Sequence, residues 1–230
     1  MGGVEVYCDP ATYPTNLSRT EQWKIAVGIH PKQVGSLTEN RWQVLKSLIQ
    51  SPQVTALGEV GLDFSVKSDK IDLQVSTFRR VLSQCTPGKP LILHIRGRSD
   101  DVCNVAASRS ALDMVKEYCD GRQPIHFHCF CGDSSVVQCW TKAFPLCYFG
   151  FTAGVRNFTQ TQVEALRAVP ENRLLLETDS PYFPVPGGAR PNTPSFIGDV
   201  AVLVAERRGS PLSRILQVTC ANTRRLYGFN

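Results

Sequence analysis

The chain has 230 residues, of which 42% are hydrophobic and 20% charged, a balance that favours one globular domain spanning residues 1–230 over a disordered segment. The formal charge of +5 permits a polyanionic substrate without requiring one, because the arginines are scattered along the chain. No apolar run reaches the roughly 18 residues that span a bilayer, so we expect a cytoplasmic or nuclear protein that does not enter membranes.

Seven short apolar runs bounded by turn residues predict β-strands. In chain order they are VEVYC, IAVGI, VTALG, PLILH, PIHFH, LCYFGF and RLLLET, which begin at residues 4, 25, 54, 90, 124, 146 and 173. The runs are apolar on both faces, and this pattern is typical of a parallel sheet that is covered on both sides.

Stretches with helical spacing lie between most of these runs, for example at 42–49 and 71–82. We interpret Ser36 with Glu39, and Thr161 with Glu164, as capping boxes at the start of two helices. A segment rich in Pro and Gly, PYFPVPGGARPNTP, follows the last strand, and two further helices close the chain.

Repeated strand and helix patterns allow either an open doubly wound sheet or a closed eight-stranded barrel. Neither G-x-G-x-x-G nor G-x-x-x-x-G-K follows any strand, so the phosphate-binding loops of the open sheet are missing. Polar residues instead end successive strands, and these are Asp9, His30, Glu59, His94, His128 and Asp179. Strand ends converge on one face of a barrel, so we favour a TIM-type (β/α)8 barrel with its chemistry there.

Three of the four histidines end predicted strands. A single histidine in such a place is more often structural than a ligand, but three of them, joined by Glu59 and Asp179, indicate a metal site. Neutral imidazole and ionised carboxylate are the ligands that divalent cations take from proteins.

The nine cysteines lie between Cys8 and Cys220 without a C-x-x-C pair, so a disulfide scaffold is not indicated. Cys129 and Cys131 alternate along an apparent strand, which favours thiols on a shared face over a zinc knuckle. We expect reduced and mostly buried thiols rather than metal ligands.

Four motifs resemble those of the TatD-type metal-dependent deoxyribonucleases, and they occur in the same order: GEVGLDF at 58–64, LHIR at 93–96, HCFCG at 128–132 and ETDSPY at 177–182. GIHP at 28–31 and NTRRLYG at 222–228 extend the resemblance over essentially the whole chain. It implies a TIM-type barrel that holds two divalent ions per complete site, Mg, Mn or Zn, and cleaves DNA, often from the 3′ end.

The resemblance also implies roles for individual residues. Glu59 would bridge both metals, His94 and His128 would complete one of them, and Asp179 would bind the other and orient or deprotonate the attacking water. Glu59 and Asp179 are therefore the candidate catalytic residues. Two cations a few ångströms apart can activate water and stabilise charge on a phosphate.

Three further residues are candidate substrate contacts. Arg96 lies two residues after His94, so on a strand it projects to the same side and could reach a phosphate oxygen. Lys32, which stands where many family members carry a second histidine, could also contact phosphate, and His30 precedes it at the same strand end.

Family members begin with a strand bearing H-x-H, whose histidines bind the same metal as Asp179, and this pair is absent here. We therefore expect seven of the eight strands, with the missing strand preceding Met1, and an unclosed barrel with two edge strands. The metal beside Asp179 would keep only Asp179 and Glu59, which are too few ligands for firm binding.

Three hypotheses follow. The first is a metal-dependent hydrolase of DNA phosphodiester bonds, acting as a 3′ to 5′ exonuclease and here N-terminally incomplete. The second is a catalytically impaired barrel that binds nucleic acid or a protein partner. The third is a related hydrolase of a C–N or carboxylic ester bond, because similar metal sites support several chemistries on one fold.

Overall fold

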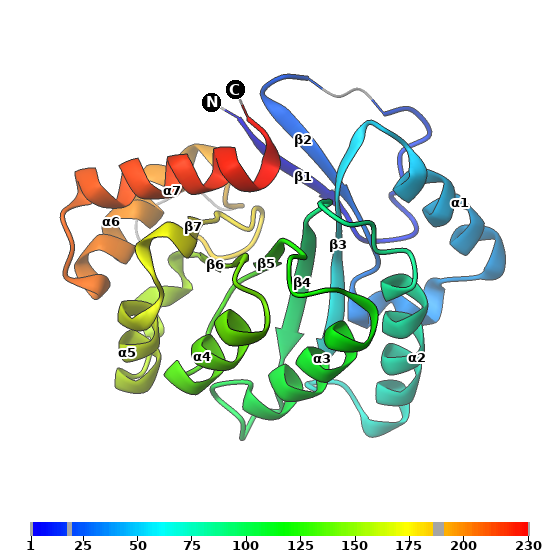
Figure 1. Cartoon of the computed structure of the whole chain (residues 1–230), viewed down its shortest axis with the longest axis horizontal. Coiled ribbons are helices and arrows are strands. Elements are labelled where there is room, and N and C mark those ends of the chain that lie inside the picture. The colour runs from blue at the N-terminus through cyan, green and yellow to red at the C-terminus, as the bar shows by residue number, and fades with distance from the viewer. Residues whose placement is uncertain (1, 18–19, 186–190, 230) are drawn as a thin grey trace.

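The computed structural model describes residues 2–17, 20–185 and 191–229, and it contains a curled sheet of seven parallel strands (Figure 1). The strands are β1 (Gly3–Tyr7), β2 (Trp23–Val27), β3 (Val54–Asp63), β4 (Leu91–Arg96), β5 (Ile125–Phe127), β6 (Cys147–Phe151) and β7 (Leu174–Leu176). Each strand pairs in parallel with the next in the chain, and the order never reverses. A doubly wound sheet would reverse at a switch point, so the predicted barrel in its seven-stranded form is confirmed.

Helices cover the outside of this sheet (Figure 1). They are α1 (Glu39–Gln50), α2 (Ile71–Leu82), α3 (Val105–Tyr118), α4 (Ser134–Ala143), α5 (Gln160–Ala168), α6 (Ile197–Arg208) and α7 (Leu212–Tyr227). Short 3-10 helices are η1 (Pro31–Ser36), η2 (Ser68–Lys70), η3 (Ala153–Asn157), η4 (Glu171–Arg173) and η5 (Pro194–Phe196). None of the helices in the described ranges is both long and apolar enough to cross a membrane.

The two predicted capping boxes are wrong. Thr38 rather than Ser36 caps α1, because the Ser36 hydroxyl already donates to a carbonyl within η1. Thr159 rather than Thr161 caps α5, and Gln162 returns the hydrogen bond to complete the box. Glutamine serves this position as well as glutamate, so the sequence offered two overlapping boxes of which the earlier one forms.

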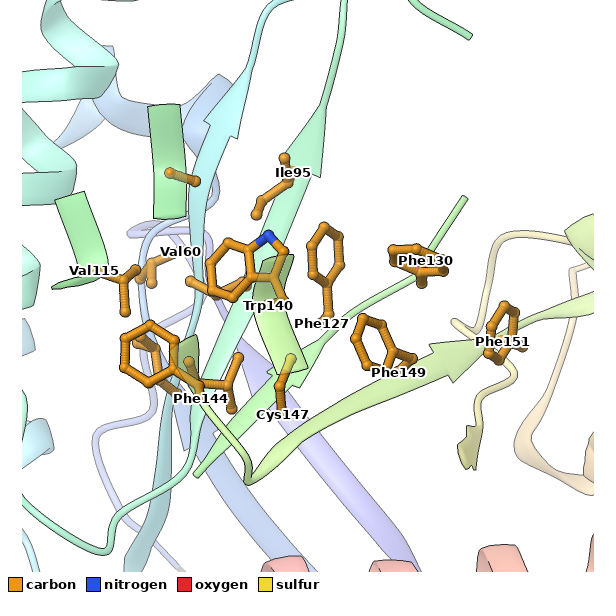
Figure 2. Packing of buried hydrophobic residues seen from close by; sticks show 14 of the residues in the cluster. Val60, Ile95, Val115, Phe127, Phe130, Trp140, Phe144, Cys147, Phe149 and Phe151 are labelled. Carbon is orange, nitrogen blue, oxygen red and sulfur yellow. The ribbon is translucent and has the colours of Figure 1, made fainter. Parts of the chain in front are cut away.

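The main apolar core lies between the outer face of the sheet and the helices. Figure 2 shows Phe127 of β5 and Phe149 of β6 beside Trp140 of α4. The rings of Phe127 and Trp140 meet edge to face with 5.4 Å between their centroids, and all three residues are at most 1% exposed. Each large apolar side chain buried in this way stabilises the fold by about 1.5–3 kcal/mol.

A second, smaller core fills the inside of the curled sheet. Alternate strand residues face inward and form it, namely Ala26, Ala56, Ile92, Tyr148 and Leu175. Leu226 and Tyr227, at the end of α7, join this cluster, and Figure 1 draws the two chain termini close together there. The last turn of α7 therefore packs inside the sheet rather than on its outer layer.

The described strands leave two edges, β1 and β7, as expected for seven strands. The β7 edge is covered by α7 in a way that the sequence did not predict. Buried Asn222 donates from its Nδ2 to the carbonyl oxygens of Leu174 and Glu171, each at 2.8 Å. The carbonyl of Leu174, in the edge strand β7, and that of Glu171, in η4 just before it, thus both accept from one buried side chain.

Candidate active site

Glu59, His94, His128 and Asp179 meet at one end of the sheet. Glu59 lies within β3, His94 within β4, His128 directly after β5 and Asp179 three residues after the end of β7. The Oε1 atom of Glu59 lies 2.6 Å from His94 Nδ1 and 3.5 Å from His128 Nε2. His128 Nε2 is also 3.5 Å from Asp179 Oδ1. The convergence expected from the strand ends is therefore present, and the binding of metal by these residues stays a prediction.

A close approach of β3 to β4 brings Glu59 and His94 together. Gly61, two residues after Glu59, has φ +148°, and a Cβ atom there would lie 2.0 Å from the carbonyl oxygen of His94. Only glycine allows this conformation and this approach. The glycines of the GEVGLDF segment thus position the two site residues.

Asp63, at the end of β3, holds the other side of the His94 ring. Its Oδ2 lies 3.3 Å from His94 Nε2 and 3.2 Å from Lys32 Nζ, and its side chain is fully buried. Lys32 therefore forms an ion pair at the rim of the site, and its contact with substrate stays a prediction. A carboxylate that orients a histidine in this way is common beside metal ligands.

Glu177 is a central residue of the site, although the sequence analysis gave it no role. It forms an ion pair with His128 Nδ1, and its Oε1 lies 3.0 Å from His126 Nε2. His126 Nδ1 in turn lies 2.6 Å from the hydroxyl of Tyr227. Glu177 lies two residues before Asp179, but β7 ends at Leu176 and Asp179 has φ 51°, so the alternation of side chains along a strand does not place this pair.

The electrostatics of the cluster favour added positive charge. Burial alone would raise the pKa of Glu59, but the neighbouring His128 and His94 lower it to about 2. Burial would likewise lower the pKa of His94 and His128, yet Asp63 and Glu59 raise that of His94. Cys129, Glu177 and Glu59 raise the pKa of His128 strongly. Asp179 has a raised pKa because of burial and the nearby charges of Glu177 and Glu59, which outweigh that of His128. With no cation bound, protonated imidazoles would balance the charge of the buried carboxylates, as a bound cation would do.

The predicted substrate contacts lie at different depths. The His30 ring packs edge to face on His94 with 4.4 Å between the centroids, and burial together with His94 lowers the pKa of His30 to about 4. Donor atoms of His30, Glu59 and His94 lie within 4.8 Å of one another, so His30 could ligate a cation. Arg96 is exposed, and no hydrogen bond or ion pair holds its guanidinium in the described part of the chain.

Two cysteines with free thiols border the cluster. Cys8, directly after β1, donates to Glu59 Oε2 at 3.8 Å, and Cys129 donates to Asp179 Oδ2 at 3.5 Å. The expected strand face shared by Cys129 and Cys131 is wrong, because β5 ends at Phe127 and Cys129 has φ 46°. Cys131 instead accepts a hydrogen bond from Asn104 Nδ2 at 2.8 Å.

The fold and the cluster are those expected of a barrel hydrolase that depends on metal, because histidine and carboxylate side chains lie together at one end of the parallel strands. The sequence model of the family described as TatD related DNase matches residues 4–228. The chain belongs to this family, so the predicted family, fold and class of enzyme are confirmed.

Similar proteins include nucleases and hydrolases. The chain is 31% identical to the human 3′-5′ RNA nuclease TATDN2 over 99% of its own length, but it covers only 30% of that protein. It is 30% identical to the uncharacterized metal-dependent hydrolase YabD of Bacillus subtilis, with 89% of this chain and 77% of that protein covered. For the 3′-5′ ssDNA/RNA exonuclease TatD of Enterobacter lignolyticus the identity is 28%, with 90% and 78% covered.

Solved structures agree on the fold. The TatD homologue YJJV from Escherichia coli K12 superposes with a TM-score of 0.82 at 21% identity, covering 99% of this chain and 86% of that one. An uncharacterized amidohydrolase from Saccharomyces cerevisiae superposes with a TM-score of 0.77 at 15% identity, covering 97% and 88%. At this identity the likeness concerns the architecture.

Proposed function

We propose that the chain is a metal-dependent nuclease that hydrolyses phosphodiester bonds of single-stranded nucleic acid, DNA included, from the 3′ end. The observation that carries this proposal is the meeting of Glu59, His94, His128 and Asp179 at the strand ends. Family membership and the names of the nuclease relatives support it.

The donor set suits divalent cations. One carboxylate oxygen of Glu59 faces His94 and His128, and the other faces Cys8. Glu59 could therefore bind two cations, one through each oxygen, and Asp179 would bind the second of them. Mg²⁺, Mn²⁺ or Zn²⁺, two per complete site, would supply a water nucleophile and offset charge on the phosphate. We assign the first cation to Glu59, His94 and His128.

The protein side chains would orient the reacting groups. Glu177 fixes the His128 ring through Nδ1 and leaves Nε2 directed at Glu59 and Asp179. Asp179 would orient or deprotonate the attacking water, and its raised pKa makes it a better base than an ordinary aspartate.

Exposed groups beside the site support a single-stranded substrate. Tyr182 donates its backbone N–H to the carbonyl of Asp179 at 2.8 Å, and its side chain is 67% exposed. Phe183 follows it and is 39% exposed. Exposed aromatic rings stack on unpaired bases, and the exposed Arg96 would bind a phosphate at the same end of the sheet.

The test is cleavage of 5′-labelled single-stranded DNA and RNA by the full chain before and after removal of metal. Cleavage should stop in chelator and return with added Mn²⁺, Mg²⁺ or Zn²⁺. Glu59→Gln should lower the rate by about 100-fold or more, since even residues beyond the direct ligands cost about 10–100-fold in metal sites. Glu164→Gln, an exposed change on α5, should leave it unaltered. Undiminished cleavage in excess chelator would contradict the proposal.

A further inference from the structure

We propose that Tyr227 is a positioning residue for His128 and that it acts through a network of hydrogen bonds formed by Tyr227, His126 and Glu177, which we call the Tyr227 network. The inference rests on the proposed function and deepens it, because it adds residues that hold a metal ligand without binding the cation. Tyr227 lies in the last turn of α7, so the network connects the C-terminal helix with the strand ends.

Three contacts link four side chains in series. The hydroxyl of Tyr227 lies 2.6 Å from His126 Nδ1, and His126 Nε2 lies 3.0 Å from Glu177 Oε1. The other oxygen of Glu177, Oε2, forms an ion pair with His128 Nδ1. The far nitrogen of the His128 ring, Nε2, lies 3.5 Å from carboxylate oxygens of the cluster on two sides.

The chemistry of these groups sets the direction of each hydrogen bond. An ionised carboxylate only accepts, so both histidines donate to Glu177, His126 from Nε2 and His128 from Nδ1. A histidine ring with one proton, on Nε2, accepts at Nδ1, and the phenol of Tyr227 is therefore the donor to His126. The proton on Nδ1 of His128 leaves the lone pair of Nε2 free, which is the form that binds a metal.

The surroundings of the network favour one arrangement. Tyr227 and His126 are both buried, and Tyr227 belongs to the core cluster inside the sheet. Glu177 Oε1 also accepts from the backbone N–H of Cys129 at 3.2 Å, so both oxygens of this carboxylate are engaged. Loss of the Tyr227 hydroxyl leaves His126 Nδ1 as a buried acceptor without its donor. A change in the His126 ring then loosens Glu177, and through it His128.

The first test is the position of the ring protons in long-range ¹H–¹⁵N spectra of the full chain, before and after saturation with Zn²⁺. The sequence has four histidines, so labelling this residue type gives few signals, and His126→Leu identifies those of His126. His126 should carry its proton on Nε2, and His128 in the zinc-bound protein should carry it on Nδ1. Tyr227→Phe should change the ring signals of both histidines.

Tyr148→Phe is the matched control. Tyr148 is also buried, pairs with His126 in the sheet and belongs to the same inner cluster, yet its hydroxyl makes no hydrogen bond within the described ranges. This variant should leave the proton positions unchanged. A proton on Nδ1 of His126 in the wild-type protein, or ring signals that Tyr227→Phe does not alter, would overturn the inference.

The second test is a double-variant cycle on Zn²⁺ affinity, measured by calorimetric titration, with thermal melts to confirm that each variant folds. Tyr227→Phe should lower the affinity by about 3- to 10-fold, the effect of one hydrogen bond. His126→Leu should lower it by about 10- to 100-fold, as for other partners of metal ligands. In the His126→Leu background Tyr227→Phe should have no further effect, because the network is already interrupted. His126→Gln, whose amide can donate to Glu177, should recover part of the loss.

Two separate losses that add in the double variant, or equal affinities for Tyr227→Phe and Tyr148→Phe, would overturn the inference. Neither test needs nucleic acid, so the expected spectra and affinities without any cleavage would refute the proposed function alone. Zinc-dependent cleavage together with a His128 ring that does not respond to Tyr227→Phe would refute this inference alone.

Discussion

Gly150 of β6 gives Glu177 its place in the site. A Cβ atom at this position would lie 1.4 Å from Glu177 Oε1 and 2.5 Å from His126 Nε2. Gly150→Ala should therefore displace Glu177 from His128, slow nucleic acid cleavage and lower the free energy of unfolding by about 1–3 kcal/mol. Urea unfolding and the cleavage rate measure the two effects.

The matched control is Gly198→Ala in α6, where an added Cβ meets no atom within 4 Å. Alanine is the better helix former, so the free energy of unfolding of this variant should rise by up to about 1 kcal/mol, and its cleavage rate should not change. Equal losses in the two variants would show that Gly150 has no particular role in holding Glu177.

Tyr182 is expected to bind substrate rather than to stabilise the fold, because its side chain is 67% exposed. Loss of one base–aromatic stack costs about 1–3 kcal/mol, so Tyr182→Ala should raise KM for single-stranded nucleic acid by about 5- to 150-fold. Metal affinity should not change. Tyr118→Ala, which removes another exposed tyrosine on α3, is the control. Identical KM values for the two variants would rule out stacking at Tyr182.

Some residues of the site could be predicted from sequence and others could not. Glu59, His94 and His128 were identified because strand ends can be recognised locally and converge in any barrel. Glu177 gains its role from the neighbours that it contacts across the sheet, and these contacts leave no local pattern. The chain leaves the strand direction at Cys129, where φ is 46°, so a period-two pattern could not place that thiol.

At the scale of elements, α7 stabilises the sheet through one buried side chain. Asn222 supplies both hydrogen bonds to the carbonyl oxygens of Leu174 and Glu171 at the β7 edge. Asn222→Ala removes both hydrogen bonds, although the carbonyl oxygen of Glu171 keeps the one from the backbone N–H of Leu174, and the variant should lower the free energy of unfolding by about 1–3 kcal/mol in urea. Gln217→Ala on the exposed face of α7 should have little effect, and an equally small loss for Asn222→Ala would mean that water replaces the amide.

The elements themselves could largely be predicted, because all seven strands and the two closing helices follow from apolar periodicity. Helix starts at Thr38 and Thr159 were missed because competing hydroxyls stand nearby and only the folded chain selects among them. The packing of Tyr227 inside the sheet depends on contacts with β5, far away in sequence. Such long-range contacts have no signature in local sequence.

At the scale of the whole molecule, the charge of the cluster makes stability depend on pH and on metal. The pKa values of His94 and His128 are raised in the fold. Their protons therefore stabilise the metal-free protein fully below pH 6.5, and this stabilisation is lost as the pH rises through the pKa values of the folded state. The pKa of Glu59 is lowered to about 2, so its contribution is present above 4.5 and is lost as the pH falls towards 2. Burial lowers the pKa of His30 to about 4, so this residue costs stability as the pH falls below 6.5, and metal-free stability should be greatest near pH 6.5.

Divalent metal should restore the stability that the metal-free protein loses above pH 6.5. Cations need neutral imidazole, so the rise in Tm on adding Zn²⁺ should be larger at about pH 8 than at about pH 6. Thermal melts of the wild-type chain and of Glu59→Gln measure it, and the variant should gain much less. An equal rise in Tm at both pH values would mean that Zn²⁺ binds without displacing the protons of His94 and His128.

Anomalous diffraction from crystals of the full chain soaked with Mn²⁺ or Zn²⁺ tests the central claim most directly. Our account predicts anomalous peaks about 2.0–2.3 Å from ligand atoms of Glu59, with His94 and His128 on one cation and Asp179 on the other. Peaks only elsewhere on the molecule, with these four side chains free of metal under saturating conditions, would contradict the account.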